Sequence, residues 1–592
     1  MCGIVGGVSN KPIRNYLIEG LKTIEYRGYD SAGIAVFNGK KAEIYKVRGR
    51  VEDLDNKLEK RIDGLVGIGH TRWATHGEPS VINAHPHASK SGLFSIVHNG
   101  VIENFRAVKN ALMEKGYSFL SETDTEVIAN VIEENYRHTG DVYKAISKMM
   151  SDVKGSYALA ILFNKEPDII YFAKNRSPLL IGRGQNGNFL ASDYLPMLKV
   201  ADQFVTISDY QYGSISLHDI KMFGRNDHPL PIVFHEMELK PEALDLNGYP
   251  HYMLKEIEEA DSCVKLLVDN YYDGKSFLFD KEMMRQIKEA DNIVFLACGT
   301  SYHACLLGSR FFKNAGKISD VYIASEWAYN PYTSGKKTVY IFMSQSGETA
   351  DLIHCLSVAK KMDGTIITIT NTQGSTLSRS ADHTLLLYAG IEVAVASTKA
   401  YIAQVSALAL LAGALNDDAS VIADLEAVIA AQQSVIDNHD KIKNLAAFVS
   451  GKNDVYFLGR GLDYDLALEC SLKLKEITYI HSEAFPGGEL KHGPIALIEK
   501  DTPVIGFISD AKTELAMRSN LHEVEARGAR VIVVSSITLA HPEDDFVVPY
   551  APKYLSSLVK VLFGQYLAYY VALKRGLNID KPRNLAKSVT VE

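Results

Sequence analysis

The sequence predicts a multidomain protein in which a layered α+β domain precedes two doubly wound α/β units. Residues 1 to about 220 carry short β-rich runs broken by Asn-Gly and Gly turns, a pattern typical of sheets packed against helices. From about residue 285 strands and helices alternate, as they do around a parallel sheet. The alternation starts again near residue 454, and a length of 592 residues leaves room for about four domains.

The first domain is expected over residues 2–220. Its strands are predicted at 31–37, 95–98, 157–162 and 169–173, and its two helices at 101–115 and 125–136. Residues 221–284 are predicted to be a linker, because four of the eighteen prolines fall within 226–250 and few periodic signals occur there.

The two α/β units are expected over residues 285–425 and 445–582, followed by a C-terminal tail, 583–592. Strands are predicted at 292–297, 339–343, 365–370 and 383–388 in the first unit, and at 454–458, 503–509 and 530–536 in the second. We interpret this recurrence as an internal duplication. One large doubly wound domain is the alternative, which the helical stretch between the two halves disfavours.

The composition excludes several classes of protein. The chain is 46% hydrophobic and 23% charged, as ordinary globular proteins are, and its net charge of −8 argues against a nucleic-acid or anionic-membrane surface. The most apolar stretch, 402–415, is shorter than the roughly 20 residues of a bilayer span, so it is predicted to be a buried helix. The N-terminus does not read as a signal peptide, and six scattered Cys residues without a CxxC motif indicate a reducing, cytoplasmic location.

Cys2 is the first candidate catalytic residue. Removal of Met1 would leave a free α-amino group on the residue that carries the thiol. With a reference pKa of about 8, that amine can act as the general base for its own side chain. The ordinary alternative is a small buried Cys in a first strand.

Five neighbouring motifs strengthen this interpretation: YRGYDSAG (26–33), HTRWATHGEP (70–79), NAHPH (83–87), HNG (98–100) and SETDTE (121–126). Together they resemble the N-terminal-nucleophile glutamine amidotransferase domain over about residues 2–220. The Asn99 amide and the Gly100 N–H are suitable donors to an oxyanion. Arg72 and Asp124 can pair with the carboxylate and the ammonium of a free amino acid.

The same resemblance implies further roles. Thr75, His76 and His85 are expected to bind glutamine, and Trp73 to gate the passage of ammonia. Plainer readings stay open: Asn99–Gly100 is also a tight-turn dipeptide, and Asp124 could cap a helix. The nearby histidines could hold a metal, but no Cys or carboxylate partner recurs at a regular interval, so no metal is predicted.

Two loops of the first α/β unit, CGTS and SQSGET, lie where a strand turns into a helix. Backbone N–H groups and hydroxyls there can cradle an anion, and the absence of a Lys from either loop excludes a nucleotide P-loop. A sugar monophosphate fits, although N-capping alone could explain the hydroxyls. The expected contacts are Cys298, Gly299, Thr300, Ser301, Ser344, Gln345, Ser346 and Thr349. The matching loop of the second unit, 459–464, lacks these hydroxyls, so we expect one phosphate site.

Four more motifs, ASTKA (396–400), LKLKEI (472–477), GELKHGP (488–494) and LAKSVTVE (585–592), complete the pattern. With the two loops they resemble SIS (sugar isomerase) domains and, from residue 2 to 592, the glutamine–fructose-6-phosphate aminotransferase family. The resemblance assigns ring opening to His492, proton transfer to Glu476, an assisting cation to Lys473 and a Schiff-base amine to Lys587. It also adds three sugar-phosphate contacts: Glu392, Val395 and Ser397. Plainer interpretations stay open: Lys473, Lys475 and Glu476 could form a solvated helix face, residues 492–494 could be a turn, and the segment around Lys587 could be a frayed chain end.

The resemblance implies that the chain converts glutamine and fructose 6-phosphate to glutamate and glucosamine 6-phosphate, the first step of amino-sugar biosynthesis. It implies a homodimer that needs no cofactor and binds neither nucleic acid nor membrane. Three rivals remain: an amidophosphoribosyltransferase-like amidotransferase, a sugar-phosphate-sensing regulator built on SIS domains, and a metal-binding structural protein. The regulator would need a DNA-binding helix-turn-helix and a basic face, neither of which is evident.

Overall fold

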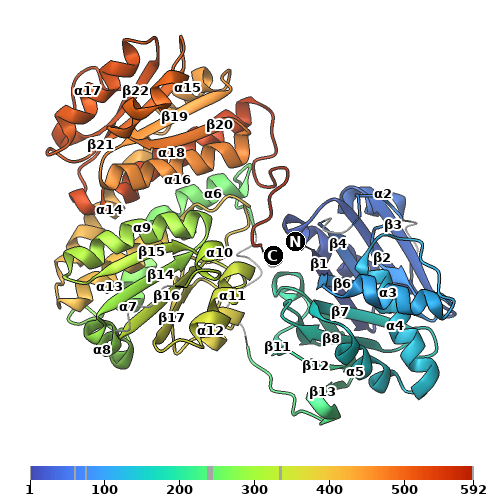
Figure 1. Cartoon of the computed structure of the whole chain (residues 1–592). Helices are drawn as coiled ribbons and strands as arrows, with labels where there is room; N and C mark the ends of the chain where they lie inside the picture. Colours follow the sequence, from blue (N-terminus) through green and yellow to red (C-terminus); the bar gives the residue numbers. More distant parts are fainter. Residues whose placement is uncertain (1, 59–61, 74–76, 237–244, 332–336, 590–592) are drawn as a thin grey trace. The chain divides into compact units, whose positions relative to one another are not determined.

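In the computed structural model, which describes residues 2–58, 62–73, 77–236, 245–331 and 337–589, the chain divides into two units. The first comprises residues 1–243 and 588–592, and the second comprises residues 244–587 (Figure 1). None of the helices in the described ranges is both long and apolar enough to cross a bilayer. The apolar stretch 402–415 is confirmed as part of a buried helix.

The first unit contains two antiparallel sheets. One sheet has the order β11 (Gln203–Thr206), β9 (Leu180–Gly184), β10 (Gly187–Ala191), β1 (Gly3–Ser9), β4 (Val66–Arg72), β2 (Ser31–Phe37), β3 (Ala42–Arg48). The other has the order β13 (Ile220–Phe223), β12 (Gln211–Ile215), β8 (Ile170–Asn175), β7 (Gly155–Phe163), β6 (Phe94–Ile102), β5 (His87–Ala88).

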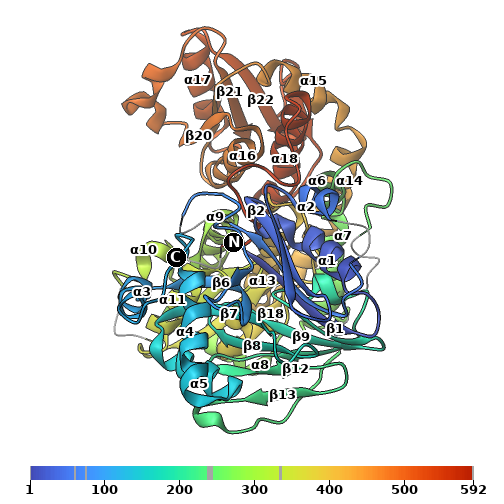
Figure 2. The same cartoon turned by 90° about the vertical axis from the view of Figure 1, so that its right-hand side faces the viewer.

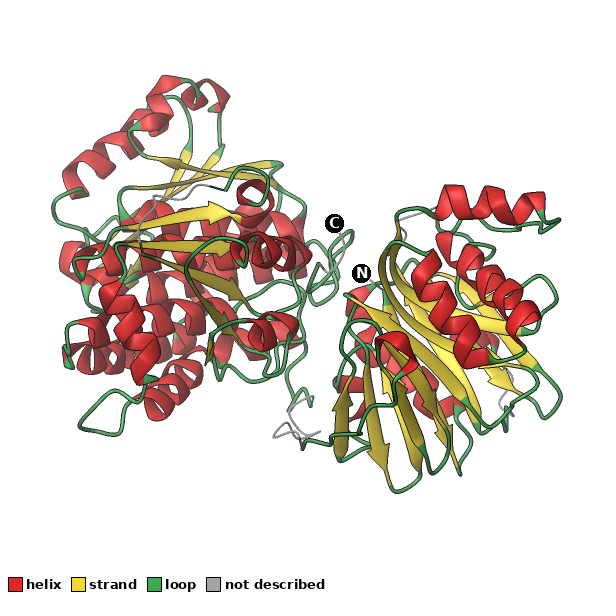
Figure 3. Cartoon of the chain, turned by 60° about the horizontal axis from the view of Figure 1, so that its bottom comes forward, coloured by secondary structure: helices red, strands yellow, loops and turns green. Residues whose placement is uncertain are grey.

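The two sheets pack face to face, because alternate residues of each strand are apolar and point to one side. Ile4 and Ile68 of the first sheet meet Val97 and Phe172 of the second in one core. Figure 3 shows the strands of the sheets in yellow. On the outer faces, α1 (Arg14–Ile24) covers β1 and β4, while α4 (Asp124–Thr139) and α5 (Val142–Asp152) cover the second sheet (Figure 2). The predicted layered α+β architecture is therefore confirmed. Two shorter helices, α2 (Val51–Lys57) and α3 (Phe105–Glu114), complete the unit.

The second unit contains two parallel sheets of five strands each. The first has the order β15 (Ser319–Ile323), β14 (Asn292–Ala297), β16 (Thr338–Ser344), β17 (Thr365–Thr370), β18 (His383–Leu386). The second has the order β20 (His481–Pro486), β19 (Asp454–Gly459), β21 (Pro503–Ile508), β22 (Arg530–Ser536), β23 (Phe546–Val548). Two separate sheets confirm two doubly wound units and exclude one large doubly wound domain.

Helices cover both faces of each sheet, as buried parallel strands require. The first sheet is flanked by α7 (Ala260–Tyr271), α8 (Lys281–Glu289), α9 (Gly299–Asn314) and α13 (Lys399–Leu415) and, on its other face, by α10 (Ala324–Trp327), α11 (Ala350–Ala359) and α12 (Thr376–Ser380). The second is flanked by α15 (Asp440–Val449), α16 (Leu462–Thr478), α18 (Ser557–Lys574) and, opposite, α17 (Glu514–Glu525).

One continuous core joins the two sheets of this unit. Leu408 of α13 and Phe563 of α18 belong to it, and α14 (Ser420–Asp437) contributes Leu425. Both α16 and α18 lie between the sheets (Figure 1). The segment 221–284, for which we predict a linker, holds the end of β13, the helices α6 (Tyr252–Glu258) and α7, and the first turn of α8. Met253, Ile257 and Val264 of these helices are buried in the shared core, so that part of the segment is not an irregular connection.

Candidate active sites

Cys2 lies directly before β1, at the sheet edge where the neighbouring strand β4 ends. Because β1 and β4 are antiparallel, with Gly3 opposite Thr71, the residue that follows β4 comes to lie beside Cys2. That residue is Trp73, whose backbone N–H donates to the Cys2 sulfur at 3.3 Å, while its carbonyl oxygen is 3.5 Å from the same sulfur. The candidate nucleophile is thus held by the main chain of the predicted ammonia gate.

Asn99, on β6, presents an amide group to Cys2. Its Nδ2 donates to the Cys2 carbonyl oxygen at 3.0 Å. The other end of the amide is fixed by His70, whose Nε2 lies 3.1 Å from Asn99 Oδ1 and 2.9 Å from the His98 carbonyl oxygen. Burial lowers the pKa of His70 to about 3, so the ring is neutral and its Nε2–H can donate to both oxygens. The Asn99 side chain therefore directs an N–H donor toward Cys2. A nucleophilic thiol would need such a donor to stabilise an oxyanion.

Gly100 follows Asn99 inside β6 rather than in a turn. Asn99 and Gly100 are paired with Ala158 and Tyr157 of β7, so the tight-turn interpretation is wrong. Gly100 has a φ of +134°, and a Cβ there would lie 2.1 Å from the Ser156 carbonyl oxygen. Only glycine fits this position, which leaves the backbone beside Asn99 uncovered by a side chain.

Arg72 and Asp124 bring opposite charges near the thiol. Arg72, the last residue of β4, is 3% exposed and donates to the carbonyl oxygens of Gly77 and Glu78 at 3.1 and 3.4 Å. Asp124, 4% exposed, accepts the backbone N–H of Ile102 at 2.8 Å. Burial raises the pKa of the Cys2 thiol, Arg72 opposes that rise, and Asp124 adds to it. The N-cap of α4 is Thr123, so the alternative role of Asp124 as the cap is wrong.

Four buried histidines, His70, His85, His87 and His98, lie close to these residues. His85 and His98 share the Thr125 hydroxyl at 3.1 and 3.0 Å, and His70 stacks on His85 with ring centroids 4.0 Å apart. Burial lowers the pKa of His85 well below its ordinary value, so its ring is neutral. In the described ranges no three His, Cys, Asp or Glu side chains are grouped so that they could hold a metal ion. Thr75 and His76, predicted to bind glutamine, lie outside the described residues.

In the second unit, the two hydroxyl-rich loops leave neighbouring parallel strands at the same edge of the sheet. CGTS follows β14 and SQSGET follows β16, as expected for a binding site at the carboxyl ends of strands. In the second loop the Ser344 hydroxyl lies 3.0 Å from that of Thr349 and accepts the Gly347 N–H, also at 3.0 Å. A φ of +65° and the Ser375 hydroxyl, 2.0 Å from where a Cβ would lie, require glycine at position 347.

Lys473 forms the centre of a buried charged cluster on α16. Its Nζ lies 2.5 Å from Glu476 Oε2, 3.6 Å from Glu469 Oε1, and donates to the Thr300 hydroxyl at 3.0 Å. Lys473 is fully buried and Glu476 is partly buried, so the alternative of a solvated helix face is wrong for these two residues and holds only for Lys475, which is exposed. Burial raises the pKa of Glu476 against the opposing effect of Lys473, which favours its neutral form more than in water.

Glu469 belongs to this cluster but is not among the residues predicted from the sequence. It accepts a hydrogen bond from the Thr300 hydroxyl at 3.1 Å and pairs with His303 at 2.8 Å. It thereby ties α16 to the loop that begins α9. Glu469 precedes Lys473 by four residues and Glu476 by seven, which places all three on one helix face. This spacing is the signal from which Glu469 could be predicted.

Lys587 is tied down within the second unit and is not a frayed chain end. Its side chain is 5% exposed and its Nζ donates to Glu392 Oε2. The same oxygen accepts from the Ser397 hydroxyl at 2.9 Å, and Oε1 accepts the N–H groups of Thr398 and Ala400 at 2.8 and 3.1 Å. Burial alone would raise the pKa of Glu392, but Lys587 and these donors hold it at about 2. The charge of Lys587 also lowers the pKa of Glu476, against the larger effect of burial.

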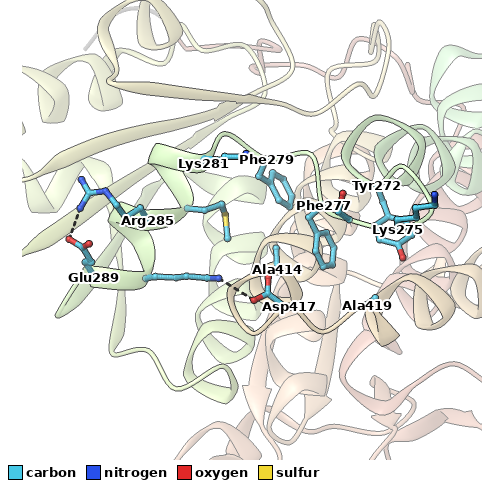
Figure 4. Close-up of a pocket in the computed structure, with 13 residues that line it drawn as sticks. Tyr272, Lys275, Phe277, Phe279, Lys281, Arg285, Glu289, Ala414, Asp417 and Ala419 are labelled. Carbon is cyan, nitrogen blue, oxygen red and sulfur yellow. Dashed lines mark hydrogen bonds and ion pairs between the residues drawn. The ribbon is translucent and has the colours of Figure 1, made fainter.

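Two other predicted residues, His492 and Val395, form no described hydrogen bond to Lys473 or Lys587. His492 is exposed on a 3-10 turn, Glu489–His492, and no described hydrogen bond or ion pair joins it to Lys473 or Lys587. The Val395 N–H donates to the Asp580 carbonyl oxygen at 3.0 Å. A surface cavity of about 530 Å³ lies beside α8, lined by Tyr272, Phe277 and Arg285 among others, and contains none of the predicted site residues (Figure 4).

Comparison with known proteins gives concordant results. Residues 70–199 match the family described as "Glutamine amidotransferase domain", and residues 286–414 and 448–575 each match "SIS domain". Proteins named glutamine–fructose-6-phosphate aminotransferase [isomerizing] are 44% identical in Geobacillus kaustophilus and 43% identical in Listeria monocytogenes, over 100% of both chains. A solved structure, the C-terminal domain of glucosamine-fructose-6-phosphate aminotransferase from Francisella tularensis, is 32% identical with a TM-score of 0.55, and covers 57% of this chain and 100% of its own.

Proposed function

The chain belongs to the isomerizing glutamine–fructose-6-phosphate aminotransferase family, and we propose that it transfers the amide nitrogen of glutamine to fructose 6-phosphate. The products are glutamate and glucosamine 6-phosphate, as in the first step of amino-sugar biosynthesis. One observation carries the proposal: the second unit holds a buried amine, Lys587, paired with Glu392, and a buried lysine–carboxylate pair suited to proton transfer, Lys473 with Glu476. The test is to incubate the protein with both substrates and assay both products. Equal amounts of glutamate and glucosamine 6-phosphate are expected, and glutamate alone would contradict the proposal.

The first half of the reaction is glutamine hydrolysis at Cys2. The thiolate attacks the side-chain carbonyl carbon, and the Asn99 amide and Gly100 N–H stabilise the resulting oxyanion. Collapse of this intermediate releases ammonia and leaves a thioester, which water hydrolyses to glutamate and the free thiol. The α-amine, free after loss of Met1, takes the thiol proton at the start and returns a proton to the leaving nitrogen. Trp73, whose main chain contacts the Cys2 sulfur, is the proposed gate for the ammonia.

Arg72 and Asp124 are proposed to bind the carboxylate and ammonium of glutamine. Arg72→Ala should raise the glutamine KM strongly and leave the fructose 6-phosphate KM nearly unchanged. Loss of one partner of a buried charged contact costs about 2–5 kcal/mol in binding. Steady-state kinetics with each substrate varied in turn measure both constants. Equal increases in the two KM values would count against this role.

The second half of the reaction takes place in the second unit. We propose that His492 protonates the ring oxygen of fructose 6-phosphate, and that the neutral amine of Lys587 then condenses with the C2 carbonyl and releases water. Ammonia displaces the lysine at C2. Glu476, next to the Lys473 cation, takes a proton from C1 and returns it to C2, which converts the ketose skeleton to the aldose.

The phosphate is proposed to bind the hydroxyl-rich loops that follow β14 and β16. Ser346→Ala combined with Thr349→Ala should weaken fructose 6-phosphate binding, because both hydroxyls and the adjacent helix start would serve the same anion. Glutamine hydrolysis measured alone should not change. Arg460→Ala is the matched control in the second sheet, where the guanidinium already donates to Asn520 Oδ1 at 2.8 Å. If Arg460→Ala removes phosphate affinity and the double variant does not, the site lies in the other half.

We further propose that the enzyme is a cytoplasmic homodimer. The exposed position of His492, without a described hydrogen bond to Lys473 or Lys587, is consistent with a residue that serves the site of a second copy. All six cysteines, which all lie in the described ranges, carry free thiols, as is usual in a reducing compartment. The negative net charge of −8 supports the absence of nucleic acid among the partners.

A further inference from the structure

Glu256 is a buried carboxylate outside the residues assigned to either site. It lies on α6 and is 2% exposed. Its Oε1 accepts the backbone N–H of Val393 at 2.5 Å and that of Ala394 at 3.1 Å. Its Oε2 is buried and has no hydrogen-bond partner in the described part of the chain. A buried acidic group with one oxygen unpaired destabilises the fold, so stability does not account for its presence at this position.

The two residues that Glu256 holds directly follow Glu392, the partner of Lys587. Their backbone therefore sets where the Glu392 side chain starts. Glu392 is held from the other side by the N–H groups of Thr398 and Ala400. The side chains of Glu256 and Glu392 thus fix the short segment 392–400. Glu392, at the start of this segment, positions the Lys587 amine.

Asp580 connects α6 to the segment that follows Glu392. Its two carboxylate oxygens accept the N–H groups of Tyr252 and Met253, at the start of α6, at 3.0 and 2.9 Å. Its carbonyl oxygen accepts the N–H of Val395 at 3.0 Å. The helix that carries Glu256, the segment after Glu392, and the chain seven residues before Lys587 are therefore linked in a ring of hydrogen bonds. The position of the Lys587 amine is therefore set by the segment that precedes it and by the segment that carries Glu392.

We propose that Glu256 is a positioning residue for the Lys587 amine, acting through the backbone of Val393 and Ala394 on Glu392. The inference rests on the proposed function, in which Lys587 is the amine that condenses with the sugar. Burial and the neighbouring Glu392 raise the pKa of Glu256 to about 8, so the group is mostly neutral at pH 7. A neutral carboxyl keeps one carbonyl oxygen as an acceptor, and a glutamine side chain provides the same acceptor at the same reach.

The test compares Glu256→Gln, which keeps the reach and the acceptor, with Glu256→Asp, which keeps the acid but is one methylene shorter. The readout is the rate at which borohydride traps fructose 6-phosphate on Lys587, followed by peptide mass. Glu256→Gln should trap within about threefold of the unchanged protein. Glu256→Asp should be slower by about 100-fold, the cost typical of a misplacement of about 1 Å. Its KM for fructose 6-phosphate should stay close to normal, since the phosphate loops are intact.

Two controls separate positioning from general damage. Glu258→Gln changes a carboxylate on the same helix that accepts from the Tyr249 hydroxyl, and should trap normally. Glutamine hydrolysis and the melting temperature should be unchanged in Glu256→Gln. Equal trapping by Glu256→Asp and the unchanged protein, or slower trapping by Gln than by Asp, would overturn the role of Glu256. Failure of the unchanged protein to trap sugar on Lys587 would instead refute the proposed function.

Discussion

A Cys2→Ala variant should release no measurable glutamate from glutamine, while its isomerisation of the sugar phosphate stays measurable. The thiol is the atom that bonds to the substrate, so its removal should lower glutamine hydrolysis by about 10⁴-fold. The sugar site lies in the other unit and keeps its own residues. A protein in which Met1 removal is blocked should lose glutamate release in the same way, because the α-amine is then no longer next to the thiol.

The measurement is glutamate release in the absence of fructose 6-phosphate, together with sugar isomerisation in the absence of glutamine. Cys355→Ala is the matched control, since Cys355 is buried in the other unit, where its thiol donates to the Ala324 carbonyl oxygen. It should hydrolyse glutamine normally. Normal glutamate release by Cys2→Ala, or by the protein with Met1 retained, would show that Cys2 is not the nucleophile.

Lys587→Arg should abolish both the covalent sugar adduct and isomerisation. Arginine can keep the ion pair with Glu392, but its guanidinium stays charged and cannot act as an amine nucleophile. The expected loss is about 10⁴-fold in isomerisation, with glutamine hydrolysis intact. Borohydride reduction with fructose 6-phosphate, followed by peptide mass analysis, locates the adduct.

Lys475→Arg is the control for this change, because Lys475 is exposed on α16 and lies outside the buried cluster. It should form the adduct on Lys587 at the normal rate. An adduct on another lysine in the unchanged protein, or full activity after deletion of residues 587–592, would rule out Lys587 as the amine.

The sequence predicts those parts of the fold that depend on local pattern. Strands such as β14 and β22 are continuous apolar runs because both of their faces are buried, and their bounds agree with the prediction. The strand β20 was missed, since it lies at the edge of its sheet and its residues, HSEAFP, form no apolar run. The helices α6 and α7 are not predicted, because the prolines nearby are typical of an irregular linker, although buried residues such as Met253, Ile257 and Val264 recur at helical spacing.

The same distinction applies to the candidate sites: some features leave a local signal in the sequence, and others depend on tertiary contacts. Loops at strand ends can be read from sequence, because a strand, a turn and a helix each leave a local signal. The partnership of Lys587 with Glu392 joins residues 195 apart, and that of Thr300 with Glu469 joins residues 169 apart. No local pattern specifies such pairs, and only the family resemblance suggested Lys587 and Glu392. His303 and Glu256 have no motif of their own, and their roles follow from tertiary contacts alone.

Transfer of isotopically labelled nitrogen tests the central claim most directly. The protein is incubated with fructose 6-phosphate and glutamine carrying heavy nitrogen in its side-chain amide, in a buffer that contains unlabelled ammonium. If the chain moves the amide nitrogen internally from Cys2 to the sugar at Lys587, the glucosamine 6-phosphate should carry the heavy nitrogen and match glutamate in amount. Glucosamine 6-phosphate that carries nitrogen from the buffer, or glutamate formed without any amino sugar, would contradict the account.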